Sequence, residues 1–318
     1  MRQLSKWGVS LALTGLIAVL CARSSRAGQD DIAVFKADTR LKVLQVSVVD
    51  KNGKLLTDIP QSSFKVFEDK VEQPIKVFRR EDVPVSMGLL IDNSGSMREK
   101  RVKVAAASLA LVKASNPQDE VFIVNFNDEA FLDQPFTSEI KKLEEALDRL
   151  DTRGGTAMRD AISLAMDYTK QNAKKDKKVL LVITDGNDNA SDITPEQLLR
   201  KVQQSDGMLL YCIGLLSEEE PREATAAKRA LKQLAEASGG VVYYPKDLAE
   251  VERITPQIAH EIRNQYIIAY SPLNQNLDGT YRQIRVSVAG HGDARTQKGY
   301  YATDPAAKAA PKVPAPAK

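Results

Sequence analysis

The sequence predicts an α/β protein in which a doubly wound, mostly parallel sheet is flanked by a smaller, β-rich, sandwich-like domain. Two observations predict this architecture. Between residues 85 and 264, short apolar runs alternate with helical patterns, which is typical of an open parallel sheet with helices on both faces. Within residues 28–84 and 265–302, the runs instead alternate between apolar and polar residues, which is the period of a half-exposed strand.

The N-terminal segment 28–84 is predicted to form hairpins. Its runs LKVLQVSVVD, FKVFED and IKVFRR are separated by turn-forming residues, notably at Asp50–Gly53. The C-terminal segment 265–302 supplies three further runs, QYIIAYSP, TYRQIRVSVAG and TQKGYYA. Because neither segment is large enough to bury a good core alone, we expect the two to pair in one domain, with residues 85–264 inserted between them.

The central segment 85–264 is predicted to alternate strands and helices. Its first strand, SMGLLID, follows Val85, and the later strand KKVLLVIT is so apolar that both of its faces must be covered. Further strands are predicted at EVFIVNF, AFLDQPF, MLLYCIGLL and VVYYP. Helices are predicted at residues 97–115, 138–150, 156–172, 224–238 and 248–263, and another begins at Pro195, where proline takes its favoured first helical position.

Residues 1–27 have the three parts of a secretory signal peptide. A basic start precedes about 15 uncharged residues that end at Cys21, and small residues follow before a cleavage point. The apolar stretch falls short of the roughly 20 residues needed to span a bilayer, so we expect no transmembrane helix in the mature chain. The sequence therefore predicts export to the periplasm or the extracellular space, and lipid modification at Cys21 stays open as an alternative to simple cleavage.

Cleavage also changes the charge and the cysteine content. Residues 1–27 carry four basic residues and no acidic ones, so the formal net charge changes from +3 to −1. A nucleic-acid partner is not expected, because that would need a concentrated basic surface. Cys212 becomes the single cysteine and is expected to be a buried apolar residue. The tail 303–318 is rich in Pro, Ala and Lys and is expected to be disordered.

Oxygen-bearing side chains gather in three loops beside predicted strands and helices. Asp92, Ser94 and Ser96 follow the first central strand, Thr156 opens a helix, and Asp185 follows KKVLLVIT. Such loops meet at the carboxyl ends of parallel strands. Two carboxylates and three hydroxyls form a hard-oxygen donor set that suits Mg²⁺ best, with Mn²⁺ or Ca²⁺ possible, and does not suit zinc. Two carboxylates roughly balance a dication and leave a coordination position for an outside oxygen.

These motifs, DNSGS at 92–96, GGT at 154–156 and TDG at 184–186, resemble the metal-ion-dependent adhesion site of von Willebrand factor type A domains. No motif position departs from the pattern, and the order of elements resembles that family over about residues 85–264. The flanking segments resemble a bacterial subgroup of secreted proteins with this domain.

The resemblance implies a Rossmann-like fold and a role for each ligand. It implies that Ser94, Ser96 and Thr156 bind the metal directly, that Asp92 and Asp185 act largely through water, and that an acidic group of a partner completes the coordination. The implied function is adhesion or another envelope interaction with a protein or envelope macromolecule that offers a carboxylate.

Four other interpretations were weighed against this one. A scaffold or assembly subunit of an envelope complex would use the same metal site and stays open. A phosphatase-like hydrolase is disfavoured because Ser94 stands where a second acid would protonate the leaving oxygen. A serine hydrolase lacks GxSxG around any serine, and His260 and His291 are the only histidines. Helix-capping polar residues would explain one motif but not three. We therefore predict no enzymatic activity and no catalytic residues.

Overall fold

The computed structural model describes residues 41–303 except residues 81, 115, 149–151, 187, 206 and 217–219. The predicted signal peptide, the rest of the segment before residue 41 and the tail from residue 304 lie outside the described residues. The described residues all belong to one compact unit, which lies within residues 39–318. In this described part, no helix combines the length and the apolar character needed to cross a membrane.

A six-stranded sheet forms the centre of the α/β part, with the strand order β10-β9-β8-β5-β6-β7. Its strands are β5 (Val85–Asp92), β6 (Glu120–Phe126), β7 (Ala130–Thr137), β8 (Lys177–Thr184), β9 (Met208–Gly214) and β10 (Val242–Tyr243). All neighbours are parallel except β7, which pairs antiparallel with β6. Every residue of β5, β6 and β9 is buried, which explains why these strands read as continuous apolar runs.

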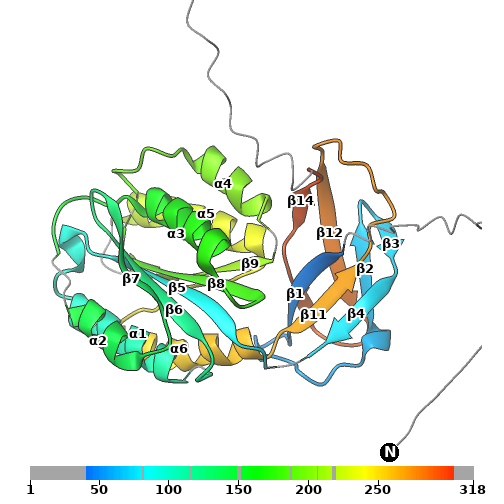
Figure 1. Cartoon of the computed structure of the whole chain (residues 1–318), viewed down its shortest axis with the longest axis horizontal. Coiled ribbons are helices and arrows are strands. Elements are labelled where there is room, and N and C mark those ends of the chain that lie inside the picture. The colour runs from blue at the N-terminus through cyan, green and yellow to red at the C-terminus, as the bar shows by residue number, and fades with distance from the viewer. Residues whose placement is uncertain are drawn as a thin grey trace, which may run out of the picture. The chain divides into compact units, whose positions relative to one another are not determined.

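Helices cover both faces of this sheet, so the predicted doubly wound α/β fold is confirmed. They are α1 (Arg101–Ala114), α2 (Ile140–Asp148), α3 (Met158–Asn172), α4 (Pro195–Gln203), α5 (Pro221–Ser238) and α6 (Leu248–Arg263). Helices α1, α2 and α6 share one hydrophobic core with the sheet, and α3, α4 and α5 share the other (Figure 1). Cys212 lies in the second core, where burial raises the pKa of its thiol to about 12.

Two helix starts differ from those predicted by three residues or more, while α2 and α3 each begin two residues later than predicted. The helix expected from residue 97 begins only at Arg101, after a 3-10 turn η2 at Gly95–Met97. The helix expected from residue 224 already begins at Pro221, at the position that proline favours. Helix α4 begins at Pro195 as predicted, and a capping box formed by Thr194 and Gln197 satisfies backbone groups at its start.

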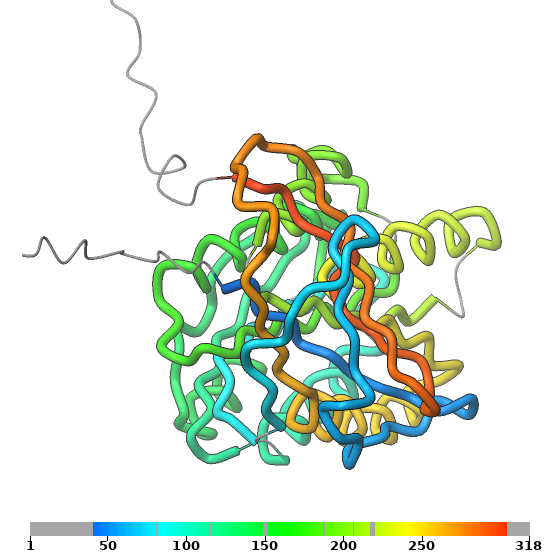
Figure 2. Tube along the Cα trace, turned by 90° about the vertical axis from the view of Figure 1, so that its right-hand side faces the viewer, coloured from blue at the N-terminus to red at the C-terminus, as the bar shows by residue number. Residues whose placement is uncertain are grey.

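Two four-stranded antiparallel sheets form the β-rich part, with the orders β13-β1-β11-β4 and β14-β12-β2-β3. Their strands are β1 (Lys42–Val49), β2 (Phe64–Glu68), β3 (Val71–Gln73), β4 (Ile75–Arg79), β11 (Tyr266–Tyr270), β12 (Tyr281–Val288), β13 (Asp293–Arg295) and β14 (Gly299–Tyr301), with a 3-10 turn η1 at Gln61–Ser63. Strand β11 lies between β1 and β4, and β12 pairs with β2, so both sheets combine early and late segments of the chain (Figure 2). The two sheets share one hydrophobic core, and the predicted sandwich-like fold is confirmed. The exact domain limits expected from the sequence, at residues 28–84, 85–264 and 265–302, stay a prediction.

A buried ion pair lies within this sandwich. Glu68 and Arg282 have side chains 3 % and 2 % exposed, and the Arg282 Nη1 lies 3.2 Å from the Glu68 Oε1. Tyr270 donates a hydrogen bond to the Glu68 Oε2 at 2.7 Å, and Tyr300 donates to the same atom at 3.0 Å. Arg282 also donates to the backbone carbonyls of Asn274 and Asn276. Both partners of the ion pair therefore have hydrogen-bonded neighbours, as buried charges require.

Candidate metal site

The structure places Asp92 and Asp185 at the same edge of the central sheet. Asp92 is the last residue of β5, and Asp185 directly follows β8. These strands are parallel neighbours, with Ile91 opposite Ile183, so their carboxyl ends coincide. Asp92 is 1 % exposed and Asp185 is fully buried. The register of two apolar strands thus brings two buried carboxylates together.

The Asp92 carboxylate is surrounded by neutral donors. Its Oδ1 accepts a hydrogen bond from the Ser94 backbone N–H at 2.8 Å, and its Oδ2 accepts one from the Thr184 hydroxyl at 2.6 Å. Burial raises the pKa of the Asp92 carboxyl from 3.8 to about 6, and the charge of Asp185 acts in the same direction, whereas the hydrogen bonds from Thr184 and Ser94 lower it. A cation beside Asp92 would relieve this cost of burial.

Two serine hydroxyls bridge toward the second carboxylate. The Ser94 Oγ lies 3.1 Å from the Ser96 Oγ, and the Ser96 hydroxyl donates to the Asp185 Oδ1 at 2.9 Å. Ser94 is extended, with φ −61° and ψ 165°, and stands directly before the turn η2. Four predicted ligands, Asp92, Ser94, Ser96 and Asp185, therefore form one connected group of oxygen atoms.

The loop that carries Thr156 is joined to the neighbouring loops by hydrogen bonds, but no contact of the Thr156 hydroxyl with the other four ligands is seen among the described residues. The Gly95 N–H donates to the Gly154 carbonyl at 3.2 Å, which joins the first and second loops. The Thr156 N–H donates to the Asn189 side chain at 2.8 Å, which joins the second and third loops. Gly154 has φ +72°, and a Cβ there would lie 1.9 Å from the Asp128 carboxylate, so the loop requires glycine at this position.

A cation that was not predicted from the sequence, Lys100, lies in the site. The Lys100 Nζ donates a hydrogen bond to the Asp185 Oδ2 at 2.7 Å, and the Lys100 side chain is only 11 % exposed. Lys100 lies between η2 and α1, in a stretch that the sequence assigned to a regular helix. A search for charged groups within one helical turn of the serine motif could have found it.

The acidic stretch after Asp185 stabilises its own loop and the start of α3. The Asp188 carboxylate accepts hydrogen bonds from the Arg159 backbone N–H at 2.6 Å and from the Ser191 hydroxyl at 2.7 Å. It also forms an ion pair with the Arg159 guanidinium at 3.1 Å. Among the described residues, no group of three or more His, Cys, Asp or Glu side chains could hold a metal ion. The proposed site has only two such side chains, because its other three ligands are hydroxyls.

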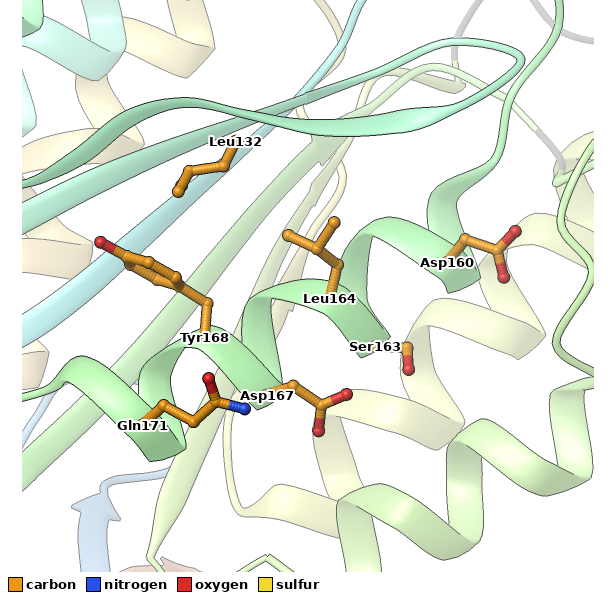
Figure 3. A pocket seen from close by; sticks show the side chains of 7 residues that line it. All are labelled: Leu132, Asp160, Ser163, Leu164, Asp167, Tyr168 and Gln171. Atoms are coloured by element: carbon orange, nitrogen blue, oxygen red, sulfur yellow. The ribbon is translucent and has the colours of Figure 1, made fainter.

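A groove beside α3 does not contain any of the five predicted ligands. It has a volume of about 540 Å³ and is lined by Leu132 of β7 and by Asp160, Ser163, Leu164, Asp167, Tyr168 and Gln171 of α3 (Figure 3). Its carboxylates already have partners, because Asp160 accepts from two backbone N–H groups and Asp167 pairs with Lys201 at 2.7 Å. The chemistry of the donor set favours the sheet edge over this groove.

The oxygen atoms at the sheet edge fit a small divalent cation. Carboxylate and hydroxyl oxygens are the donors that Mg²⁺ prefers. The hydrogen bonds to Asp92 all come from neutral groups, and burial holds the pKa of this carboxyl near 6, so a positive charge there would be favourable. The two histidines are exposed, so neither offers a buried imidazole ligand.

Comparisons with known proteins support the fold of this part of the chain. Residues 87–187 match a family model described as von Willebrand factor type A domain. A solved structure, von Willebrand factor type A from Catenulispora acidiphila, is 16 % identical and has a TM-score of 0.50, covering 84 % of this chain and 74 % of that one. The chain therefore contains an α/β domain with the von Willebrand factor type A fold.

Two further solved structures have lower TM-scores. The PilB minor pilin from Streptococcus sanguinis is 14 % identical, with a TM-score of 0.46, covering 60 % of this chain and 63 % of that one. An aerotolerance-related membrane protein from Bacteroides fragilis NCTC 9343 is 19 % identical, with a TM-score of 0.47, covering 56 % of this chain and 98 % of that one. The search of curated proteins returned no match.

Proposed function

We propose that this chain is an exported, metal-dependent binding module that recognises an acidic group of a protein or another envelope macromolecule through one divalent cation. The observation that carries the proposal is the connected oxygen group at the sheet edge. Asp92 and Asp185 are buried there, and the hydroxyls of Ser94 and Ser96 form a hydrogen-bonded path from one loop to the second carboxylate.

The proposed ligands have two roles. Ser94, Ser96 and Thr156 offer neutral hydroxyl oxygens, and Asp92 and Asp185 supply the negative charge. Mg²⁺ suits this donor set best, and Mn²⁺ or Ca²⁺ are alternatives. When bound, the cation would act as a Lewis acid toward an oxygen atom that the partner supplies.

The proposal includes no catalytic step. A phosphatase of the aspartate type needs a second acid near the nucleophile, and Ser94 occupies that place. A hydroxyl hydrogen-bonded to another hydroxyl cannot protonate a leaving oxygen as a carboxylic acid does. Binding, without turnover, is the activity that these residues support.

Calorimetric titration with Mg²⁺ and Mn²⁺ tests the ligand assignment. The double variant Ser94→Ala, Ser96→Ala should bind either ion at least about 100-fold more weakly than the wild type, because both bridging oxygens are lost. Ser62→Ala removes an exposed hydroxyl in the sandwich and is the control, with wild-type affinity expected. Unchanged affinity in the double variant would contradict the assignment.

A pull-down from the envelope fraction tests the metal-bridged partner. Capture of the partner should be lost in EDTA and in Asp92→Ala, because both remove the cation from the recognition step. A partner that is retained in both conditions would exclude metal-bridged recognition and would favour a metal-independent scaffold.

A further inference from the structure

The Lys100 ammonium lies inside the proposed metal site and shares one of its carboxylates. Its Nζ is 2.7 Å from the Asp185 Oδ2, while the other oxygen of Asp185 accepts the hydrogen bond from Ser96. The Asp185 side chain is 0 % exposed, so water does not reach its carboxylate to screen the ion pair. Asp185 therefore belongs both to the oxygen group and to an internal ion pair.

The position of Lys100 is fixed by its backbone. The Lys100 N–H donates to the Met97 carbonyl at 3.0 Å, and the Lys100 carbonyl accepts from the Val104 N–H at 3.0 Å. One contact ties Lys100 to the turn that carries the serines, and the other ties it to the first turn of α1. The ammonium is thus held beside the site by the same segment that supplies Ser94 and Ser96.

The charges of the site are unequal once Lys100 is included. Asp92 and Asp185 carry two negative charges, and Lys100 carries one positive charge, which leaves a formal charge of −1 for the group. A dication added to it would produce an excess of +1. A carboxylate from a partner would restore neutrality. Inside a buried site, such imbalances are costly because the low dielectric screens them poorly.

We propose that Lys100 is a built-in counter-charge that weakens the binding of a free dication and makes its retention depend on an acidic ligand. The inference rests on the proposed function, because it concerns the same site. Metal and carboxylate then bind with positive coupling, and each strengthens the other by the same factor. The acidic group of the partner is then the feature that the site recognises, and it is also needed for the site to retain its cation.

A purely structural role for Lys100 makes a different prediction. If the ion pair only stabilised the fold, removal of the ammonium would lower stability and leave the affinity for a cation unchanged or weaker. If the ammonium opposes the cation, its removal strengthens metal binding and abolishes the dependence on a carboxylate. Metal affinity and its response to a carboxylate therefore separate the two roles.

The test titrates the chain with Mn²⁺, with and without acetate at constant ionic strength, and follows free Mn²⁺ by its paramagnetic resonance. Lys100→Met removes the charge at similar length, Lys100→Arg keeps the charge, and Lys103→Met changes an exposed lysine of α1, three residues after Lys100. Binding of Mn²⁺ by acetate in solution affects all proteins equally, so comparison between variants cancels it. Thermal unfolding followed by circular dichroism checks that each variant is folded.

In the absence of acetate, Lys100→Met should bind Mn²⁺ on the order of 10- to 100-fold more tightly than the wild type, the range typical of coupled sites. Acetate should tighten Mn²⁺ binding in the wild type, Lys100→Arg and Lys103→Met, and should have no such effect in Lys100→Met.

Equal or weaker Mn²⁺ binding by a folded Lys100→Met would overturn the inference and leave the proposed metal site standing. If neither the wild type nor Lys100→Met bound Mn²⁺, the proposed function would fail, and the inference with it. Should Lys100→Met not fold, the wild-type response decides, because acetate without effect on Mn²⁺ binding overturns the coupling.

Discussion

Two buried carboxylates of this chain, Glu68 and Asp92, have different kinds of partners. Glu68 in the sandwich pairs with the Arg282 guanidinium and accepts hydrogen bonds from the hydroxyls of Tyr270 and Tyr300. Asp92 at the edge of the central sheet accepts hydrogen bonds from neutral groups, and burial raises its pKa to about 6. The two side chains are 3 % and 1 % exposed as residues, so the difference lies in their partners and not in their burial.

The contrast separates a structural carboxylate from one that is able to bind a cation. Around Glu68, a cation and two donors are supplied by the protein itself, and the group is complete without a ligand. At Asp92 itself, the hydrogen bonds come from the Ser94 N–H and the Thr184 hydroxyl, Lys100 pairs with Asp185 instead, and the burial of the Asp92 charge opposes folding. A metal ion would bring to Asp92 what Arg282 already brings to Glu68.

The largest expected effect follows from removal of the guanidinium. Arg282→Met leaves Glu68 charged and buried without a cation, so the free energy of unfolding should fall by about 4 kcal/mol. Urea denaturation monitored by circular dichroism measures this loss. The same variant should keep the affinity of the sheet-edge site for Mg²⁺, because the two carboxylates belong to separate networks.

Arg285→Met is the matched control for that prediction. Arg285 lies three residues further along β12 but is exposed, and its guanidinium packs over the ring of Phe67 at 4.6 Å. Its loss should lower the free energy of unfolding by less than about 1 kcal/mol. Equal losses in the two variants would show that the buried ion pair does not stabilise the sandwich in the way we describe.

The second-largest expected effect is a gain in the free energy of unfolding, and it follows from removal of the Asp92 charge. The pKa of this carboxyl rises from 3.8 in the unfolded reference to about 6 in the fold, a change of about 2 pKa units, or about 3 kcal/mol. The protonated form is therefore favoured by folding. This contribution to stability is present below about pH 4 and is lost as the pH rises through about 6.

Asp92→Asn removes the charge that causes this loss. In EDTA, the free energy of unfolding of the variant relative to the wild type should rise by about 2–3 kcal/mol between about pH 4 and about pH 8. Urea denaturation at both pH values measures the difference, and titratable groups shared by the two proteins cancel. A difference that stays constant with pH would show that the buried Asp92 carboxylate does not destabilise the metal-free fold.

The arrangement of the carboxylates at the sheet edge was predictable from sequence. Two continuous apolar runs predict buried strands of one parallel sheet, and the carboxyl ends of such strands place Asp92 and Asp185 at one edge. The contact made by Lys100 was not predicted, because the pattern after Ser96 reads as a continuous helix. The structure has a 3-10 turn there, and α1 begins only at Arg101, which changes the direction of the intervening side chains.

In the sandwich, too, the burial of a residue was predictable from the sequence, but its partner was not. Alternation along TYRQIRVSV places Arg282 on the same face as Ile284 and Val286, so its burial follows from the pattern. Its partner Glu68 lies 214 positions away, and only the pairing of β12 with β2 brings them together. Strands β3 and β13 have three residues each, which is too short for a periodic signal.

The hairpin from β2 to β3 also lacks the usual turn residues. Asp69 and Lys70 adopt φ angles of 47° and 70°, a region in which glycine and asparagine are the common choices. Neither residue occurs between the two strands, so the sequence carries no signal for this turn. The turn is instead supported by the Asp69 side chain, which accepts a hydrogen bond from the Gln283 backbone N–H of β12 at 2.8 Å.

The smallest expected effect tests how complete the Glu68 network is. Tyr270→Phe removes one hydroxyl that donates to the Glu68 Oε2 but leaves Arg282 and Tyr300 in place. The free energy of unfolding should fall by about 1.5 kcal/mol, the value of a hydrogen bond to a charged group. In a Glu68→Gln background, the same change should cost measurably less, because the acceptor then carries no charge. Equal costs in both backgrounds, measured by a double-mutant cycle, would contradict the view that charge makes this network strong. A smaller cost in the Glu68→Gln background would show that the charge of Glu68 strengthens its hydrogen bonds within the protein. Asp92 differs, because its hydrogen bonds come from neutral donors and its charge is left for a bound cation to balance.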